Sequence, residues 1–228
     1  MTGLWNQFDR MVIFDTETTG LSFTGDRIIE IGAVSLEAGA EKDGIDLFIR
    51  LPEGRRLDPF ITSLTGITEK RLASEGVGDK EAARTFINLL EGAERSLLAA
   101  YNAQFDLNFL FPLLRSCRLA GALKSAHYLD AMTVYKDRRA YPHKLCNAIE
   151  AYGLGDKAVN SHRAIDDARA TSLLLEAMAE ERDDLERYVD LFGTHPKYGM
   201  SGRKISPVTY RTQPYGRRKP LYELGQEA

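Results

Sequence analysis

Two acidic residues interrupt an apolar run near the N-terminus. Met11-Val12-Ile13-Phe14 is typical of a short buried strand, and Asp15 and Glu17 follow where the strand would continue. Residues i and i+2 of a strand point to the same face, so Asp15 and Glu17 would lie side by side, next to Ile13. Two buried like charges repel each other, and a divalent cation such as Mg²⁺ or Mn²⁺ would stabilise them. The alternative is a strand end at which both acids face water.

Composition indicates one globular domain. The chain has 228 residues, 43% of them hydrophobic and 28% charged, which suits an α/β domain with a full core and room for a tail. No apolar run approaches the roughly 18 residues of a membrane span, and the N-terminus does not resemble a signal peptide. Cys117 and Cys146 have neither metal-ligand spacing nor a disulfide pattern. We therefore expect no membrane partner, reduced cysteines and a cytoplasmic location.

The net charge of −3 hides an uneven distribution. Between Thr194 and Tyr222 seven residues are basic and none is acidic, which leaves −10 on the rest of the chain. An acidic body with a basic tail is a pattern to weigh for nucleic-acid binding. The seven basic residues are Lys197, Arg203, Lys204, Arg211, Arg217, Arg218 and Lys219.

Hydrophobic periodicity predicts strands first and then alternating strands and helices, hence a mixed sheet with helices on its faces. The expected strands are 11–15, 27–37, 45–51, 96–101 and 127–129, with Gly39 and Gly44 bracketing a turn. The expected helices are short ones within 58–75, where Thr68 could be a cap, and then 79–91, 104–118, 131–137, 144–152 and 163–181. The charge-rich stretch 180–190 is expected to be a solvated helical face.

Two further acids occupy apolar helix faces. Asp106 shares a face with Phe109, Leu110, Leu113 and Leu114. Because Asp106 lies in the first turn, it could also be an ordinary acid that interacts favourably with the helix dipole and has no other role.

Asp167 lies on the apolar face of the last helix, whereas Asp166 is turned about 100° toward solvent. His162 precedes this helix, where a lone histidine is often a surface or capping residue. Four such acids, Asp15, Glu17, Asp106 and Asp167, together with this histidine, suit two Mg²⁺ or Mn²⁺ ions roughly 3.5–4 Å apart.

Three motifs in these stretches resemble those of the DEDD exonuclease superfamily, in its histidine-bearing subclass. They are Phe14-Asp15-Thr16-Glu17-Thr18-Thr19-Gly20-Leu21, Asn102-Ala103-Gln104-Phe105-Asp106 and His162-Arg163-Ala164-Ile165-Asp166-Asp167-Ala168. They occur in the family's order and cover roughly residues 11–178. The segment Leu64-Thr65-Gly66-Ile67-Thr68 also resembles the family, and the likeness is greatest to the proofreading epsilon subunits of bacterial DNA polymerase III and their stand-alone relatives.

The resemblance implies an α/β, ribonuclease H-like fold, a mixed five-stranded sheet flanked by helices. Residues 1–193 would form the 3′→5′ exonuclease domain and 194–228 a basic C-terminal tail. The enzyme would hydrolyse DNA from a free 3′ end and release nucleoside 5′-monophosphates.

The same resemblance implies roles for individual residues. One metal would be held by Asp15, Glu17 and Asp167, and the other by Asp15 and Asp106. The first metal would lower the pKa of a bound water and the second would stabilise the leaving oxygen. His162 would be the general base.

The last residues of the first motif would contact the terminal nucleotide. Thr18, Gly20 and Leu21 would line it, with Leu21 as a wedge beside the last base. Asn102 would position a phosphate or hold its own loop. Phe105 would pack against a sugar or base, or else belong to the core.

Three alternatives stay open at this point. The substrate could be RNA, as in ribonuclease T-like or oligoribonuclease-like relatives. The chain could be an accessory module that binds a DNA polymerase subunit. The tail, in which Tyr198, Tyr210, Tyr215 and Tyr222 alternate with basic residues, could contact phosphates, stay solvated or dock on a polymerase.

Overall fold

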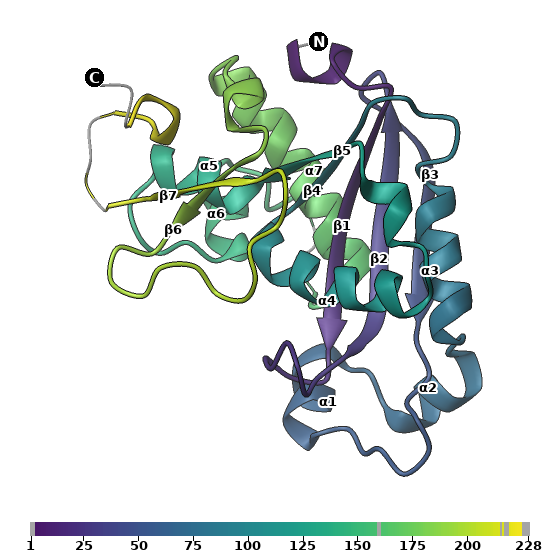
Figure 1. Cartoon of the computed structure of the whole chain (residues 1–228). Coiled ribbons are helices and arrows are strands. Elements are labelled where there is room, and N and C mark those ends of the chain that lie inside the picture. The colour runs from purple at the N-terminus through teal and green to yellow at the C-terminus, as the bar shows by residue number, and fades with distance from the viewer. Residues whose placement is uncertain (1–2, 159–160, 215, 217–218, 225–228) are drawn as a thin grey trace.

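A five-stranded sheet forms the centre of the fold (Figure 1). The computed structural model describes residues 3–158, 161–214, 216 and 219–224. The strands are β1 (Arg10–Thr18), β2 (Ile28–Glu37), β3 (Ala40–Phe48), β4 (Ser96–Ala100) and β5 (Ala126–Asp130). Their order is β3-β2-β1-β4-β5, with the first two pairings antiparallel and the last two parallel. The expected mixed five-stranded sheet is confirmed.

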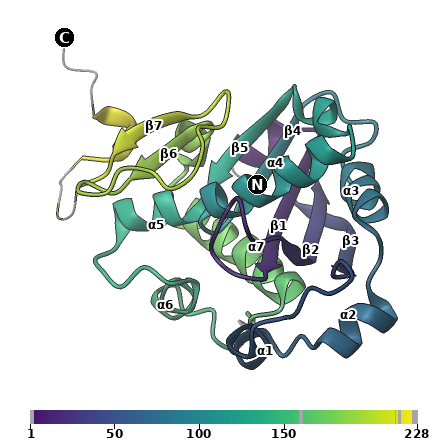
Figure 2. The ribbon, with the colours of Figure 1, turned by 60° about the horizontal axis from the view of Figure 1, so that its bottom comes forward.

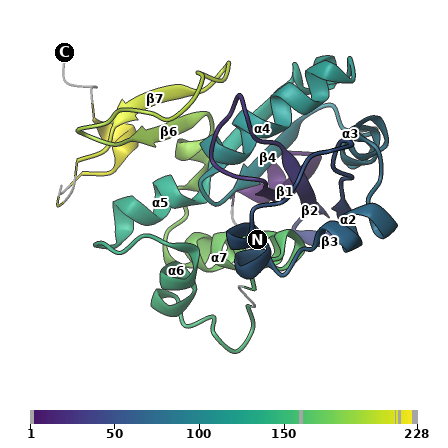
Figure 3. The same cartoon turned by 90° about the horizontal axis from the view of Figure 1, so that it is seen from below.

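Helices cover both faces of this sheet. The α-helices of the described residues are α1 (Pro59–Thr65), α2 (Glu69–Glu75), α3 (Asp79–Asn88), α4 (Ala103–Ser116), α5 (Ala131–Arg138), α6 (Leu145–Ala151) and α7 (Ala164–Glu181). Seen end-on, α7 lies on one side of the sheet and α3 and α4 lie on the other (Figure 3). Among the described residues, no helix combines the length and apolar character that crossing a bilayer requires.

Side-chain alternation along β1 builds the two cores. Ile13 packs in the cluster that contains Leu174 of α7, whereas Val12 and Phe14 pack in the cluster that contains Leu107 of α4. Successive strand residues point to opposite faces, so a period of two assigns each side chain to one helix layer. By the same alternation, the side chains of Asp15 and Glu17 point to the side of the sheet that α7 covers.

The acidic pair lies inside β1, not after it. The strand continues to Thr18 because β2 pairs with it along this whole length, with Gly32 opposite Asp15 and Glu30 opposite Glu17. The expected strand end at residue 15 was therefore wrong. Asp15 and Glu17 are half-buried within the paired length of the strand, so they do not simply turn to water beyond its end.

Two smaller expectations were wrong. Gly44 lies within β3, and the turn before it consists of Ala38 and Gly39, both at positive φ. Residues 180–190 are not a solvated helical face. The chain leaves α7 after Glu181 and forms a 3₁₀ turn, η3 (Leu185–Tyr188), in which Tyr188 is fully buried.

The C-terminal segment is folded onto the domain wherever it is described. Strands β6 (Leu191–Thr194) and β7 (Thr209–Thr212) form a parallel two-stranded sheet beside α5 (Figure 2). Tyr210 donates to Gln104 of α4 at 2.7 Å, and the hydroxyl of the buried Tyr222 donates to Asp184 at 2.9 Å. These two rings are thus engaged inside the protein.

Other tail residues differ in their surroundings. Arg211 donates to the backbone oxygens of Leu221, Tyr222 and Leu224. Lys197, Tyr198, Arg203 and Lys204 are exposed in the connection between β6 and β7. Tyr215, Arg217 and Arg218 lie outside the described residues.

Candidate active site

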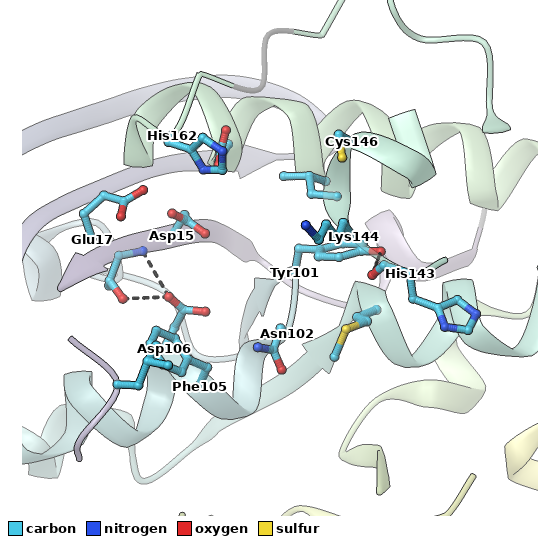
Figure 4. Close-up of a pocket in the computed structure, with 15 residues that line it drawn as sticks. Asp15, Glu17, Tyr101, Asn102, Phe105, Asp106, His143, Lys144, Cys146 and His162 are labelled. Atoms are coloured by element: carbon cyan, nitrogen blue, oxygen red, sulfur yellow. Dashed lines mark hydrogen bonds between the residues drawn. The ribbon is translucent and has the colours of Figure 1, made fainter. Parts of the chain in front are cut away.

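The four acids and the histidine of the three motifs line one cavity of about 650 Å³. Asp15 and Glu17 come from β1, Asp106 from the first turn of α4, and Asp167 from the first turn of α7. His162 lies two residues before α7 begins. Figure 4 shows the labelled side chains of these elements around the same space. The fold therefore brings together acids that are up to 152 positions apart in the chain.

Glu17, His162 and Asp167 could share a metal ion. One ligand atom from each residue lies within 4.8 Å of the other two. Carboxylate oxygen and imidazole nitrogen are ligands that Mn²⁺ and similar divalent cations accept. Asp15 extends from the same strand face as Glu17, so a cation here would have further oxygen ligands nearby. This donor set fits a divalent metal.

Asp106 reaches the cavity from the opposite helix layer and is held there by Thr16. One carboxylate oxygen accepts the backbone N–H of Thr16 at 3.0 Å and its hydroxyl at 2.6 Å (Figure 4). Thr16 lies between Asp15 and Glu17 on β1 and points to the other face. The strand thus carries two acids on one face and fixes a third through the residue between them.

Burial raises the pKa values of three of these carboxyls. The pKa of Asp15 lies well above its usual range because of burial and the neighbouring carboxylates. Burial, with the charge of Glu30 next, raises the pKa of Glu17 to about 8. Burial raises the pKa of Asp106 to about 7, although the hydrogen bonds from Thr16 lower it. Without a cation the ionised forms of these groups are disfavoured, and a bound divalent metal would displace the protons that they retain.

Glu30 holds the start of α7, and our sequence analysis did not single it out. It is fully buried on β2, opposite Glu17. Its carboxylate accepts the Arg163 Nε–H at 2.7 Å and the Ala164 N–H at 3.2 Å. A carboxylate at a helix N-terminus stabilises that end. The acid within the apolar run Ile28-Ile29-Glu30-Ile31 was the available signal.

Two residues beside the cavity have left-handed backbones. Asn102 has a φ of 69° and His162 a φ of 56°. Each lies just before a helix whose first turn carries a site carboxylate. Non-glycine residues in this region of φ and ψ concentrate at functional sites, where the surrounding structure enforces them.

The predicted substrate-binding residues divide into two groups. Leu21, Asn102 and Phe105 line the cavity, and the Leu21 side chain is 80% exposed. Phe105 also packs on the rings of Phe23 and Phe109, as expected of a core residue, and its contact with a sugar or base stays a prediction. Of the described residues, Thr18 and Gly20 are not among those that line the cavity; the Thr18 hydroxyl donates to the Gly20 carbonyl at 2.7 Å and shapes the loop.

The far end of the cavity was not anticipated. It is lined by residues from the end of β4, from α5 and from the start of α6, which carried no periodic or motif signal that we used. They are Tyr101, Met132, His143, Lys144, Leu145 and Cys146.

A protein-family model described as Exonuclease matches residues 12–175. The chain belongs to the exonuclease family. The matched stretch contains all three acidic motifs, and the expected membership of the DEDD superfamily is confirmed.

Relatives of this exonuclease chain include bacterial DNA polymerase III proteins. It is 36% identical over 182 residues to DNA polymerase III PolC-type of Clostridium perfringens (strain 13 / Type A), a match that covers 77% of this chain and 12% of that protein. It is 34% identical over 169 residues to DNA polymerase III subunit epsilon of Treponema pallidum (strain Nichols), covering 72% and 74%. The chain thus spans about an eighth of the PolC-type protein.

Solved exonucleases share this fold. The zinc-bound E. coli exonuclease I–ssDNA complex matches with a TM-score of 0.67 and 17% identity, over 79% of this chain and 42% of that chain. Exonuclease I from Methylocaldum szegediense matches with a TM-score of 0.64 and 18% identity, over 76% and 40%. The ribonuclease H-like fold is confirmed, and the family match and epsilon relatives show a 3′→5′ exonuclease domain of the epsilon type.

Proposed function

We propose that this domain is a metal-dependent exonuclease that removes nucleoside 5′-monophosphates one at a time from DNA 3′ ends. The observation that carries this proposal is the meeting of four acids and His162 in one cavity, within a chain that matches the exonuclease family. The finer points, two Mg²⁺ or Mn²⁺ ions, DNA as substrate and a role in proofreading or repair, belong to the proposal.

Asp15, Glu17, Asp106 and Asp167 would hold the metal ions. Two divalent cations would supply a more acidic water and neutralise charge on the phosphate and on the leaving oxygen. The raised pKa values of Asp15, Glu17 and Asp106 support this assignment, because burial and neighbouring carboxylates disfavour the ionised forms that bound cations would stabilise.

His162 would accept the proton of the attacking water. Its imidazole approaches Glu17 and Asp167 within the 4.8 Å group, and it is exposed at the mouth of the cavity. The water oxygen bonds to phosphorus, the bond from phosphorus to the 3′ oxygen breaks, and that oxygen takes up a proton. The products are a nucleoside 5′-monophosphate and a strand one nucleotide shorter with a new 3′-hydroxyl.

A matched pair of variants on adjacent residues tests this function. Asp167 is 6% exposed and lines the cavity, whereas Asp166 is partly exposed and accepts a hydrogen bond from Ser161. Asp167→Asn should lower the release of monophosphates from a labelled DNA oligomer by about 10³-fold or more, and Asp166→Asn should stay near wild type. A wild-type protein without nuclease activity in Mg²⁺ or Mn²⁺ would refute the proposal.

DNA is favoured over RNA because the sequence relatives are DNA polymerase III proteins. The second candidate is a 3′→5′ exoribonuclease, since the cavity is equally suited to either phosphodiester. Matched DNA and RNA oligomers digested side by side distinguish the two. Faster release of monophosphates from the RNA oligomer would make the exoribonuclease the leading candidate.

We also propose association with a DNA polymerase subunit, because the sequence relatives are DNA polymerase III proteins. The alternative to a nuclease is an accessory module whose role is to bind the polymerase. Co-purification with a polymerase tests it, and full binding by an Asp167→Asn variant would separate binding from catalysis. The proposal also includes a cytoplasmic location, residues 1–193 as the catalytic domain and 194–228 as a basic C-terminal segment, for which contact with the substrate strand and docking on a polymerase are the two roles to be tested.

A further inference from the structure

The cavity is larger than the acidic cluster that defines it. Beyond Asp15 and Asp106 it continues to α5 and the start of α6, where Met132 and Leu145 provide apolar surface. A volume of about 650 Å³ lies within the 300–1,000 Å³ that small-molecule sites occupy. There is therefore space beside the carboxylates for more of the substrate than the group that reacts.

Lys144 brings a positive charge into this part of the cavity. Among the described residues that line the cavity, it is the only lysine. Figure 4 shows its side chain at the start of α6, on the side that faces the cavity. Across the described portion of the chain, its ammonium forms no ion pair, even though four carboxyls line the same cavity. A lysine that faces acids without pairing to them remains available for an anionic ligand.

The backbone that carries Lys144 is firmly held. The Tyr101 hydroxyl donates to the His143 carbonyl at 2.8 Å, and Tyr101 directly precedes Asn102 at the start of the second motif. The His143 ring is 9% exposed and its Nε2 lies 3.1 Å from the Arg139 carbonyl. The position of Lys144 is thus tied to the strand end that also positions Asn102.

We propose that Lys144 binds the phosphate immediately upstream of the scissile one, with Met132 and Leu145 beside the penultimate nucleotide. This inference rests on the proposed exonuclease function and adds a second subsite to it. The ammonium is a compact point charge on a flexible stem, which suits a phosphate whose orientation varies between bound strands. The neighbouring acids repel that phosphate, so a cation at this place also helps to determine which way the strand enters.

The 5′-phosphate of a dinucleotide isolates this contact. Thymidylyl-(3′→5′)-thymidine carries only the scissile phosphate, and its 5′-phosphorylated form adds a phosphate at the upstream position. A charge-assisted contact predicts that wild type has a kcat/KM about 10-fold higher for the phosphorylated dinucleotide. In Lys144→Ala this ratio should fall below about 3, and in Lys144→Arg it should be retained.

Lys124→Ala is the matched control, because Lys124 is exposed before β5 and does not line the cavity. It should keep the wild-type ratio. An unchanged ratio in Lys144→Ala, or an equal loss for both dinucleotides, would overturn the inference, the latter because Lys144 would then act on the acids. A wild-type ratio near one would overturn it as well. Failure of wild type to cleave either dinucleotide or a longer oligomer would instead refute the exonuclease function itself.

Discussion

Gly32 of β2 lies directly beneath Ile165 of α7. A Cβ atom added at Gly32 would stand 2.0 Å from the backbone nitrogen of Ile165, so the helix backbone occupies the place of a side chain. Gly32 is also the residue opposite Asp15 in the sheet. This close approach of α7 to the sheet thus occurs beside Asp15 and two residues before Asp167.

Gly32→Ala should therefore move Asp167 on α7 away from Asp15 on β1. The helix would have to shift away from β2, and such overpacking costs about 1–3 kcal/mol of unfolding free energy. We expect exonuclease activity to fall by more than about 10², because a displacement of about 1 Å is enough for such a loss. Thermal unfolding and nucleotide release measure the two effects.

Gly44→Ala is the control for this substitution. Gly44 lies in the adjacent strand β3, and a Cβ there would stand 3.4 Å from the Ala33 carbonyl oxygen, which is ordinary van der Waals contact. It should be close to wild type in activity. Equal activities of the two variants would contradict the role assigned to the close contact.

Thr16→Val should shift the dependence of activity on pH. The Thr16 hydroxyl donates to Asp106 and lowers the pKa of that carboxyl, which burial has raised to about 7. Without this donor the pKa rises further, so Asp106 ionises and binds metal only at a higher pH. We expect the rising limb of the pH–rate profile to move to higher pH and activity at pH 7 to fall about 10-fold. Thr16→Ser retains the donor and should retain the wild-type profile.

Asp130→Ala should lower the unfolding free energy by more than the loss of a single helix cap would. Asp130 is 3% exposed and accepts the backbone N–H groups of Asn102, Ala103, Met132 and Thr133, so it caps α4 and α5 together. Two lost caps correspond to about 2–4 kcal/mol, measured by denaturant unfolding.

Asp58 provides the comparison for Asp130. It is exposed and caps α1 alone through the N–H of Phe60 at 2.8 Å. Asp58→Ala should cost about 1 kcal/mol. Similar losses in the two variants would show that Asp130 does not hold both helices.

The metal-free protein should lose stability as the pH rises. The pKa of Glu17 is about 8 in the folded protein and about 4.5 for the free group, so between these values the folded state keeps a proton that the unfolded state has lost. The unfolding free energy therefore decreases from pH 5 to pH 8. Thermal unfolding in the presence of a chelator should show a falling melting temperature.

Metal and substitution should both reduce this slope. Millimolar Mg²⁺ should raise the melting temperature more at pH 8 than at pH 6, because ligation replaces the retained protons. Glu17→Gln should flatten the metal-free profile. A melting temperature that rises with pH in chelator would contradict the assigned protonation of the cluster.

Removal of three exposed charges tests the C-terminal segment. Gln104 donates to the carbonyls of Ser201 and Arg203, both at 2.8 Å, and fastens this part of the segment to the first turn of α4. Replacing Lys197, Arg203 and Lys204 by alanine should reduce the salt dependence of binding to a long single strand, by about 2 in the slope of log K against log salt. Alanine at three other exposed residues is the control: Arg115 in the last turn of α4, and Arg118 and Lys124, which follow that helix. Equal slopes in the two variants would favour a segment that does not contact the strand.

Local sequence was sufficient for much of the site. The pitch of the last helix separated the buried Asp167 from the more exposed Asp166, and the structure confirms the assignment. Thr68 caps α2 as expected, with a hydrogen bond of 3.1 Å from the N–H of Arg71. These features depend on spacing within one element, which a linear pattern records.

Contacts between elements could not be predicted in this way. Nothing near Lys144 in the chain indicates that it shares a cavity with Asp15, 129 positions earlier. The burial of Tyr222 against Asp184 likewise turned an expected stacking residue into part of the core.

The sequence by itself determined which residues are acidic, which helix or strand face they occupy, and the family to which the chain belongs. Only the tertiary structure decided how far those faces are from one another. The physical reason is that helix pitch and strand alternation are set by neighbouring residues, whereas the distance from Asp15 to Asp167 depends on how closely α7 packs on β2. A missing side chain at Gly32 makes that approach possible.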